Sequence, residues 1–118
     1  MSEKSEILQT LLNSRCSEIS PKDKPLIIPS IESNISHLDG WEVPLNYAEL
    51  KKRFQFKNYY QTVAFVNAVT WLAQKEGHHP TVCFGYNHCD ISLSTHDIKG
   101  LSMNDMIMAA KINALLED

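Results

Sequence analysis

Residues 81–93 carry the sequence pattern that most restricts the fold, the alternation of a β-hairpin. Apolar residues alternate with small or polar ones on both sides of a turn at 85–88, namely at Val82, Phe84, Tyr86, Ile91 and Leu93. This period of two is typical of strands that bury one face. The segment therefore predicts two adjacent antiparallel strands whose apolar side chains share one face of a sheet.

The length of the turn decides which residues of the hairpin face each other. A two-residue turn places Phe84 opposite Ile91 and His79 opposite His96. A four-residue turn shifts every pair by two residues, and His79 and His96 are then diagonal neighbours. A shift of one residue would pair apolar with polar side chains and is disfavoured. Because directly opposed residues lie about 4.5–5.5 Å apart, both registers bring histidines from the two ends of the hairpin together.

A helix is predicted over residues 59–76, directly before the hairpin. Its apolar residues recur with the 3.6-residue period of a helix, at Phe65, Ala68, Val69, Leu72 and Ala73. Gly77 is expected just past the end of this helix, where glycine is common. His78 and His79 then lie where the helix passes into the first hairpin strand.

Two further strands are predicted upstream of this helix. Residues 41–43 follow a turn signal and have the composition of a short strand. Residues 52–57 alternate, with Phe54 and Phe56 on the buried side and charged or polar residues on the solvated side.

Downstream of the hairpin, Ser102 and Asp105 mark the start of another helix. An acidic residue three positions after a serine is similar to a capping box, in which each side chain satisfies a backbone N–H at the helix start. One face of this helix is predicted to be apolar up to its end near Leu116.

The resulting order is β-β-α-β-β-α after an N-terminal arm. Strands joined by hairpins and separated by helices predict an α+β fold, with a four-stranded, largely antiparallel sheet and helices packed on one face. Residues 36–118 are expected to form this domain. Residues 1–35 are assigned to the arm, which is expected to be partly helical because the apolar residues of 7–12 have helical spacing.

The composition limits the possible functions and partners. The 118 residues carry a net charge of −3, and the only basic run is 51–53, so the clustered positive charge of a nucleic-acid surface is missing. No apolar signal core follows the amino terminus, and the longest early apolar run, 26–28, is too short to span a membrane. The 3 cysteines lack the spacing of a disulfide framework, which indicates reduced thiols and a cytoplasmic protein.

Three histidines, His78, His79 and His96, are expected to converge at one end of the hairpin. Imidazoles titrate near neutral pH, so they can donate and accept protons there. The other two histidines, His37 and His88, lie next to or within predicted turns and are interpreted as structural. The convergence predicts an acid–base site built from imidazoles.

A metal site and a cysteine nucleophile are the chemical alternatives. Four residues near the hairpin are potential metal ligands: His79, Cys83, His96 and Asp97. However, adjacent histidines such as His78 and His79 tend to point apart, and no CxxC or HxxxH spacing places two ligands on one element, so no metal is predicted. No cysteine is tied to a histidine by a recognised spacing, which makes a thiol nucleophile less favoured still.

Several short motifs lie around the histidines and in the upstream strand and helix. They are Gly40-Trp41, Phe54-Gln55-Phe56-Lys57, Ala64-Phe65-Val66-Asn67, His78-His79-Pro80, Tyr86-Asn87, Leu93-Ser94-Thr95-His96-Asp97, and Gly100-Leu101-Ser102 with Asp105. Over about residues 36–116, this combination closely resembles the pterin-4a-carbinolamine dehydratase family. Three positions depart from the family pattern: Gln74 stands where relatives often carry an acidic residue, Val82 stands where they commonly carry tryptophan or isoleucine, and Lys99 stands where many carry glycine.

The resemblance implies a fold and an activity. Family members have a four-stranded antiparallel sheet with helices on one face, and they form homodimers or homotetramers. Their reaction is the dehydration of 4a-hydroxytetrahydropterin to quinonoid dihydropterin, which recycles the pterin used by aromatic amino acid hydroxylases. The resemblance therefore implies an enzyme with a pterin substrate, with no bound cofactor or metal, and with a functional link to such a hydroxylase.

The resemblance also implies roles for individual residues. The active-site histidines of the family match His78, His79 and His96, which are expected to act as general acids and bases. A second set is expected to bind the substrate: Trp41, Pro80, Ser94, Thr95 and Asp97. Two alternatives stay open, a non-catalytic dimerisation or scaffold module of the same fold and a small metal-binding protein.

Overall fold

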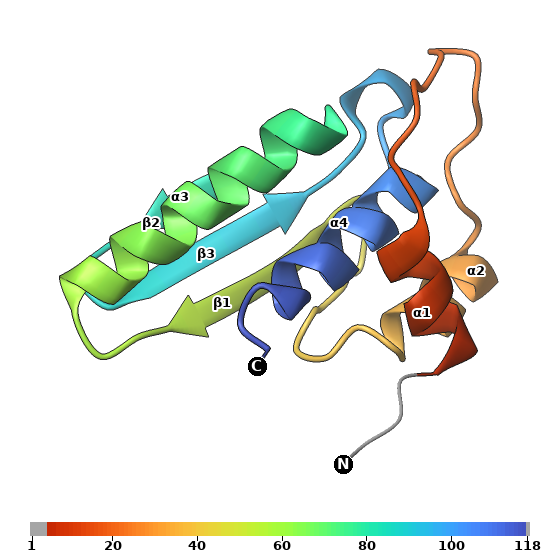
Figure 1. Ribbon diagram of the computed structural model, residues 1–118. Helices are drawn as coiled ribbons and strands as arrows, with labels where there is room; N and C mark the ends of the chain where they lie inside the picture. The colour runs from red at the N-terminus through yellow and green to blue at the C-terminus, as the bar shows by residue number, and fades with distance from the viewer. Residues whose placement is uncertain (1–4, 118) are drawn as a thin grey trace.

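The chain combines a small antiparallel sheet with four helices, and Figure 1 shows their arrangement in a computed structural model that describes residues 5–117. The helices are α1 (Glu6–Asn13), α2 (Ile28–Ile35), α3 (Tyr59–Glu76) and α4 (Met103–Ala114). The strands are β1 (Leu50–Gln55), β2 (Thr81–Phe84) and β3 (His88–Leu93), and a short 3₁₀ helix, η1 (His96–Ile98), follows β3. The predicted α+β class is confirmed. The outer ends of the predicted arm and domain, residues 1–4 and 118, lie outside the described residues.

The sheet has the strand order β1-β3-β2, and β3 is antiparallel to both neighbours. Within the hairpin, Phe84 lies opposite Cys89 and Val82 lies opposite Ile91. This is the register of the four-residue turn, inside which the N–H of Gly85 donates to the carbonyl of His88 at 3.0 Å. The structure therefore selects the longer of the two turns that the sequence left open.

The predicted strand at 41–43 is wrong. Only Glu42 pairs with β1, through two backbone hydrogen bonds of 2.9 Å to Lys51. In an antiparallel ladder, the next hydrogen-bonded pair on that side would need the N–H of Pro44. Proline has no N–H, so the pairing stops after one residue pair. Within residues 5–117 the sheet therefore has three strands instead of the predicted four.

Helices α3 and α4 cover one face of the sheet (Figure 1). The strand residues on that face are buried: Leu50, Phe54, Cys89, Ile91 and Leu93. Most of α4 is buried, and not only the single face that the sequence predicted, because α4 contacts both β3 and α1. Leu11 of α1 and Ile31 of α2 belong to the same core.

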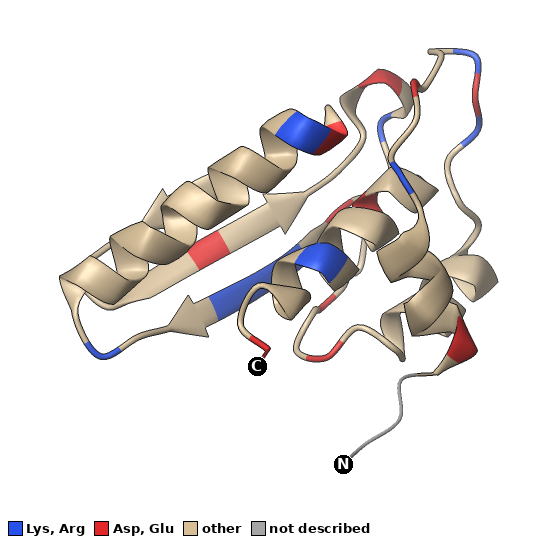
Figure 2. Cartoon of the chain, in the orientation of Figure 1, with Lys and Arg blue, Asp and Glu red and all other residues tan. Residues whose placement is uncertain are grey.

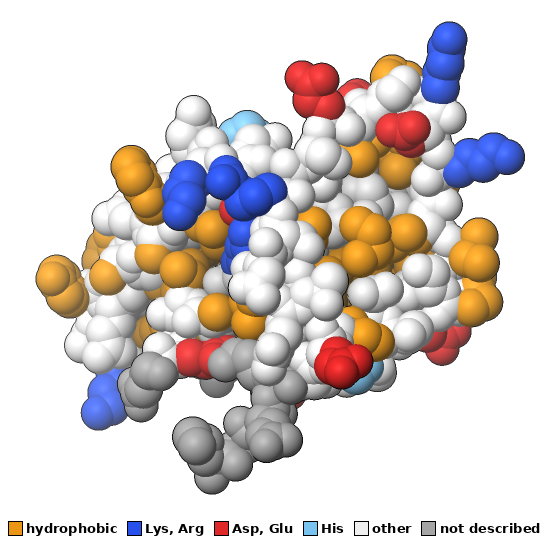
Figure 3. Space-filling model, turned by 45° about the vertical axis from the view of Figure 1, so that its right-hand side comes forward, with side chains coloured by type: hydrophobic (Ala, Val, Ile, Leu, Met, Phe, Trp, Pro, Cys, Tyr) orange, Lys and Arg blue, Asp and Glu red, His pale blue; other side chains and the backbone are white. Residues whose placement is uncertain are grey.

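The surface of the described chain mixes charges of both signs. Basic and acidic residues are interspersed along the elements (Figure 2), and hydrophobic groups lie among charged ones on the face seen in Figure 3. Exposed aromatic side chains gather on α3 and the hairpin: Tyr59, Tyr60, Trp71, Phe84 and Tyr86. None of the helices in residues 5–117 has the length and hydropathy needed to cross a bilayer.

The N-terminal arm is attached to α3 and α4 through the carboxylate of Glu76, whose side chain is 1% exposed. One oxygen of Glu76 accepts a hydrogen bond from Lys111 Nζ at 2.7 Å and lies 3.1 Å from Arg15 Nε. The other oxygen accepts from the backbone N–H of Cys16 at 2.9 Å. Since an unpaired buried charge is costly, these partners are needed to keep Glu76 inside the protein.

These contacts make the stability of the protein depend on pH. Burial alone would raise the pKa of Glu76, but the hydrogen bonds from Lys111, Cys16 and Arg15 outweigh it and lower the pKa from 4.5 to about 2. The unfolded chain therefore takes up this proton at higher pH than the folded protein does. The stabilisation by Glu76 is fully present above about pH 4.5 and is lost as the pH falls toward about 2.

We predict that Glu76→Gln reduces the loss of stability on acidification. The measurement is the free energy of unfolding in denaturant at pH 6 and at pH 3 for the wild type and the variant. The variant is expected to be less stable at pH 6, because Lys111 loses its charged partner, but to lose less stability between the two pH values. Glu42→Gln, at an exposed position, is the control and should keep the wild-type pH dependence. Equal losses for the wild type and Glu76→Gln would contradict the prediction.

Candidate active site

The three histidines singled out by the sequence line one hollow where α3, β3 and α4 meet. Its volume is about 460 Å³. The wall is formed by the arm, by the segments before and after the hairpin, and by α4: Ser17, Glu18, Ile19, Gly77, His78, His79, Ser94, Thr95, His96, Asp97 and Asn104. Three of the residues expected to bind substrate, Ser94, Thr95 and Asp97, are therefore on the same wall as the histidines.

The end of α3 sets the direction in which the first two histidines leave the helix. Gly77 has φ 72° and ψ 22°, a left-handed conformation, and its N–H donates to the carbonyl of Ala73 at 2.9 Å. Glycine adopts this conformation without the steric cost that a Cβ brings. The chain then turns away from the helix axis, with the side chain of His78 13% exposed and His79 exposed.

The exit from β3 supplies the opposite wall. The backbones of Thr95 and Gly100 pair, and the Thr95 N–H donates to the Gly100 carbonyl at 2.8 Å. This pairing closes a short loop around η1. Lys99 completes the loop with a φ of 52°. His96 and Asp97 are held exposed at the hollow by this loop, whereas Thr95 is buried.

A buried carboxylate in the first turn of α4, Asp105, connects the two walls. Its Oδ1 lies 2.6 Å from His78 Nε2. Its Oδ2 accepts from Thr95 Oγ1 at 2.7 Å and from the backbone N–H of Ser102 at 2.9 Å. Asp105 is 0% exposed, so protein donors, and not bulk water, stabilise its charge.

The hydroxyl groups beside Asp105 have one arrangement that satisfies all of them. A hydroxyl group has a single proton, and the Thr95 hydroxyl uses it to donate the hydrogen bond to Asp105. The 2.7 Å contact between Thr95 Oγ1 and Ser102 Oγ then requires Ser102 to donate. Ser102 Oγ in turn accepts from the backbone N–H of Asn104 at 3.2 Å. A continuous chain of hydrogen bonds thus runs from the start of α4 to the Asp105 carboxylate.

The contact with Asp105 determines how His78 can exchange protons. An ionised carboxylate only accepts hydrogen bonds, so Nε2 of His78 carries a proton. Nδ1 is then the ring nitrogen left to accept a proton. His79 and His96 form no side-chain hydrogen bond to any residue of 5–117 and are exposed. The site combines one oriented imidazole with two imidazoles that are free to meet a ligand.

Two residues expected at the substrate pocket do not line this hollow. Trp41 is 5% exposed, donates from Nε1 to Asn113 Oδ1 at 3.0 Å and packs edge-on against Phe54. Asn113 lies at the C-terminal end of α4, whereas the hollow lies at its N-terminal end, so Trp41 is a core residue remote from the histidines. Pro80 is half-buried and is not part of the wall.

The cysteines are poorly suited to act as nucleophiles at this site. The pKa of the Cys16 thiol is raised to about 12, mainly by burial and secondly by the nearby Glu76 carboxylate. The reactive thiolate is therefore scarce at neutral pH. Burial likewise raises the pKa of Cys89 to about 11. Cys83 is exposed, on the other face of the sheet. In the part of the chain that the structure describes, no three His, Cys, Asp or Glu side chains are grouped so that they could hold a metal ion.

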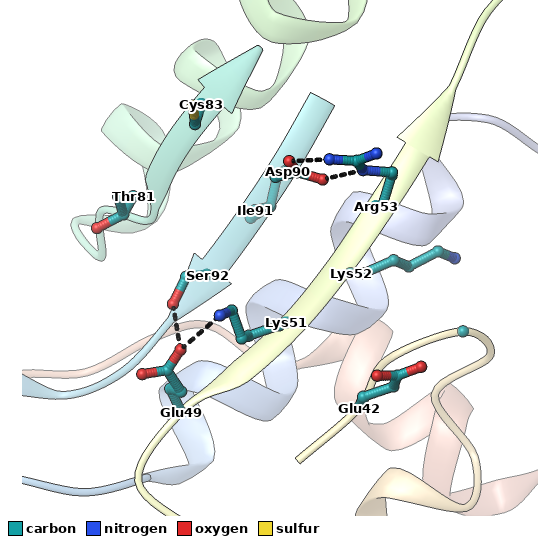
Figure 4. A pocket seen from close by; sticks show the side chains of 11 residues that line it. Glu42, Glu49, Lys51, Lys52, Arg53, Thr81, Cys83, Asp90, Ile91 and Ser92 are labelled. Carbon is teal, nitrogen blue, oxygen red and sulfur yellow. Dashed lines mark hydrogen bonds and ion pairs between the residues drawn. The ribbon is translucent and has the colours of Figure 1, made fainter. Parts of the chain in front are cut away.

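A second hollow, of about 620 Å³, lies on the outer face of the sheet (Figure 4). Four of its charged side chains form two pairs. Arg53 Nε lies 2.7 Å from Asp90 Oδ1. Glu49 Oε1 lies 3.7 Å from Lys51 Nζ and accepts a hydrogen bond from Ser92 Oγ at 3.4 Å. Charges that are already paired are poor proton donors and acceptors, and no histidine lines this hollow. We therefore assign the candidate active site to the smaller, histidine-lined hollow.

Sequence reasoning missed three features of the site: the contact of Asp105 with His78, the arm residues 17–19, and Asn104. Asp105 is recognisable in the sequence as a helix cap, but nothing in the capping pattern indicates that its second oxygen reaches His78. The sequence predicts no function for the arm residues 17–19, because weakly periodic polar residues carry no signal for what they contact. Asn104 belongs to the same group, since it lies on the wall but matches no motif.

Comparison with known sequences identifies the family. The sequence model described as pterin 4 alpha carbinolamine dehydratase matches residues 24–115. A protein of Hydrogenovibrio crunogenus, provisionally named pterin-4-alpha-carbinolamine dehydratase, is 60% identical over 107 residues, which cover 91% of this chain and 95% of the relative. A protein of Nitrosospira multiformis with the same provisional name is 44% identical over 112 residues, covering 93% of this chain and 96% of the relative.

Two solved structures are similar to the fold described above. A transcriptional coactivator/pterin dehydratase from Brucella melitensis has a TM-score of 0.74 and 29% identity, covering 78% of this chain and 98% of that chain. A pterin dehydratase-like protein, described as a RuBisCO assembly factor in the alpha-carboxysome, has a TM-score of 0.58 and 30% identity, covering 67% of this chain and 92% of that chain. Because the family model matches most of the sequence and the relatives align over nearly their whole length, this chain belongs to the pterin 4 alpha carbinolamine dehydratase family.

Proposed function

We propose that the protein is a dehydratase that removes water from 4a-hydroxytetrahydropterin and produces quinonoid dihydropterin. The observation that carries this proposal is the hollow lined by His78, His79 and His96, in which the buried Asp105 orients one of the three imidazoles. The volume of about 460 Å³ is within the range of about 300–1,000 Å³ that is usual for small-molecule sites. Membership of the family supports the same substrate.

The proposed reaction breaks the C4a–O and N5–H bonds of the substrate and moves two protons. The C4a–O bond breaks, and the leaving hydroxide takes a proton from a general acid and departs as water. The N5–H gives its proton to a general base, and the electron pair of that bond forms the C4a=N5 double bond. Imidazoles can perform both steps near neutral pH, and each positioned acid or base typically contributes about 10²–10⁴-fold in rate.

We assign His78 and His79 as the acid–base pair nearest C4a and His96 as the further donor or acceptor. Asp105 acts as a positioning residue, because it holds Nε2 of His78 protonated and leaves Nδ1 for proton exchange. Ser94, Thr95 and Asp97 are assigned to the wall against which the ring binds.

Replacing His79 tests the assignment of the acid–base groups. His79→Ala should lower kcat by at least about 100-fold, because one positioned proton donor or acceptor is lost, while the fold survives because His79 is exposed. The measurement is turnover of enzymatically generated 4a-hydroxytetrahydropterin, with circular dichroism as a check on folding. His37→Ala, a histidine outside the hollow, is the control. A His79→Ala variant with wild-type turnover would remove the assignment.

Replacing Asp105 tests its positioning role. Asp105→Asn should lower kcat by about tenfold or more and change the pH dependence of kcat, because the amide no longer fixes the protonation of His78. It should also cost about 1–3 kcal/mol of stability, since buried donors lose their acceptor. Ser102→Ala is the matched control, because it weakens the same helix cap without touching His78. If both variants lower stability and leave the pH profile unchanged, Asp105 has only a structural role.

A non-catalytic interaction module is the second candidate function. The similar Brucella and carboxysome proteins are described as a coactivator and as an assembly factor. Trp71 and Tyr60 on α3 are 73% and 82% exposed, which is more than a helix that only covers a sheet requires. The three histidines distinguish the two functions, because a pure scaffold has no physical need for an oriented acid–base cluster.

Elemental analysis tests the metal-binding alternative. We expect the purified protein to contain far less than one equivalent of zinc and to keep its turnover after treatment with EDTA, because imidazoles alone supply the proton transfers. More than about half an equivalent of tightly bound zinc would instead favour a metal site.

The biological setting follows from the proposed reaction. We propose that the protein acts in the cytoplasm as a homodimer or homotetramer and regenerates the pterin of an aromatic amino acid hydroxylase. The exposed aromatic residues of α3 offer a surface for self-association.

A further inference from the structure

The part of the arm that lines the histidine hollow lies outside the region matched by the family model. The family model begins at residue 24, whereas residues 17–19 line the hollow. The alignment with the Brucella structure covers 98% of that chain but 78% of this one. Part of this chain therefore has no counterpart in that structure. Residues 17–19 lie before the region that the family model matches. The similarity to the Hydrogenovibrio protein covers 91% of this chain and includes them.

The arm is held firmly at the hollow. Asn104, which is 4% exposed, binds the backbone of Ser17 twice: Oδ1 accepts from the N–H at 3.0 Å, and Nδ2 donates to the carbonyl at 2.7 Å. One residue earlier, the N–H of Cys16 donates to Glu76. Further along, the N–H of Leu26 donates to the carbonyl of Leu101 at 2.8 Å. Residues 17–19 therefore lie in a segment attached on both sides, as a binding wall must be.

Glu18 is the acidic side chain that the arm adds to this wall. It is exposed and forms no hydrogen bond or ion pair with any other residue of 5–117. A carboxylate only accepts hydrogen bonds, so its natural complement is a group with N–H or O–H donors. The proposed substrate carries such donors on its ring system, in the amino group, the ring N–H groups and the C4a hydroxyl, and on any hydroxyl groups of the C6 side chain.

We propose that Glu18 is a substrate-binding residue of the active site, supplied by the arm, and that its carboxylate accepts hydrogen bonds from N–H or O–H donors of the bound pterin. This inference rests on the proposed dehydratase function. It assigns to the arm a role in affinity, and not in the proton transfers, which remain with the histidines.

Kinetics of Glu18→Gln and Glu18→Ala test this inference. Loss of a hydrogen bond to a charged acceptor weakens binding by about tenfold or more. We therefore expect KM to rise about tenfold in Glu18→Ala and somewhat less in Glu18→Gln, with kcat within about twofold of the wild type. Glu6→Gln is the matched control, because it removes the same charge from the same arm outside the hollow. Thermal unfolding should be unchanged in both Glu18 variants, since Glu18 has no partner to lose among the described residues.

Two substrates distinguish the donor groups. One carries a hydroxylated C6 side chain and the other carries a methyl group there. A rise in KM confined to the first substrate identifies the side-chain hydroxyls as the donors, and an equal rise for both identifies donors of the ring system. An unchanged KM for both substrates, with an active wild type, overturns the inference.

A binding measurement separates this inference from the dehydratase proposal. The dissociation constant of an unreactive oxidised pterin can be measured by fluorescence for the wild type and both Glu18 variants. If the wild type has no turnover, the dehydratase proposal fails, but weaker pterin binding by the Glu18 variants would still support the role of Glu18. Equal dissociation constants for all three proteins would overturn it.

Discussion

The buried carboxylate of Asp105 is the constraint on which the arrangement of the site depends. Removing a carboxylate from water costs several kcal/mol unless hydrogen bonds and favourable charges compensate. The compensation comes from three separate parts of the chain: the α4 N-terminus through Ser102, the β3 exit through Thr95, and the α3 exit through His78. The positive end of the α4 dipole adds to it. A substitution that removes one of these three donors therefore also affects the hydrogen bonds that the other two make to Asp105.

The end of α3 joins this network to the attachment of the arm. Glu76 and His78 are separated only by Gly77, whose left-handed conformation sends their side chains to different partners. Glu76 binds Lys111 and the arm, whereas His78 binds Asp105. Both carboxylates of this region, Glu76 and Asp105, are almost fully buried and paired. The proposed catalytic groups and the arm are thus both attached at the end of α3.

The sequence predicted those features that depend on local patterns. Period-two and period-3.6 spacing located the hairpin and α3, and the motifs around the histidines indicated the family. The prediction of a fourth strand was wrong because Pro44 ends the hydrogen-bonded pairing with β1. The strand-like composition at 41–43 does not reveal this. The contact of Asp105 with His78 and the place of Glu18 depend on tertiary packing between segments far apart in the chain. No local pattern contains that information.

The three cysteines differ in a way that matters for handling the protein. The thiols of Cys16 and Cys89 are held protonated by burial, so oxidants and alkylating reagents find little thiolate to attack. Cys83 is exposed and lines the hollow on the outer face of the sheet, whereas His78, His79 and His96 line the other hollow. A maleimide dye or spin label added to the unmodified protein would therefore attach at Cys83. Such a probe would report on the outer face of the sheet and would leave the histidine-lined hollow unobstructed.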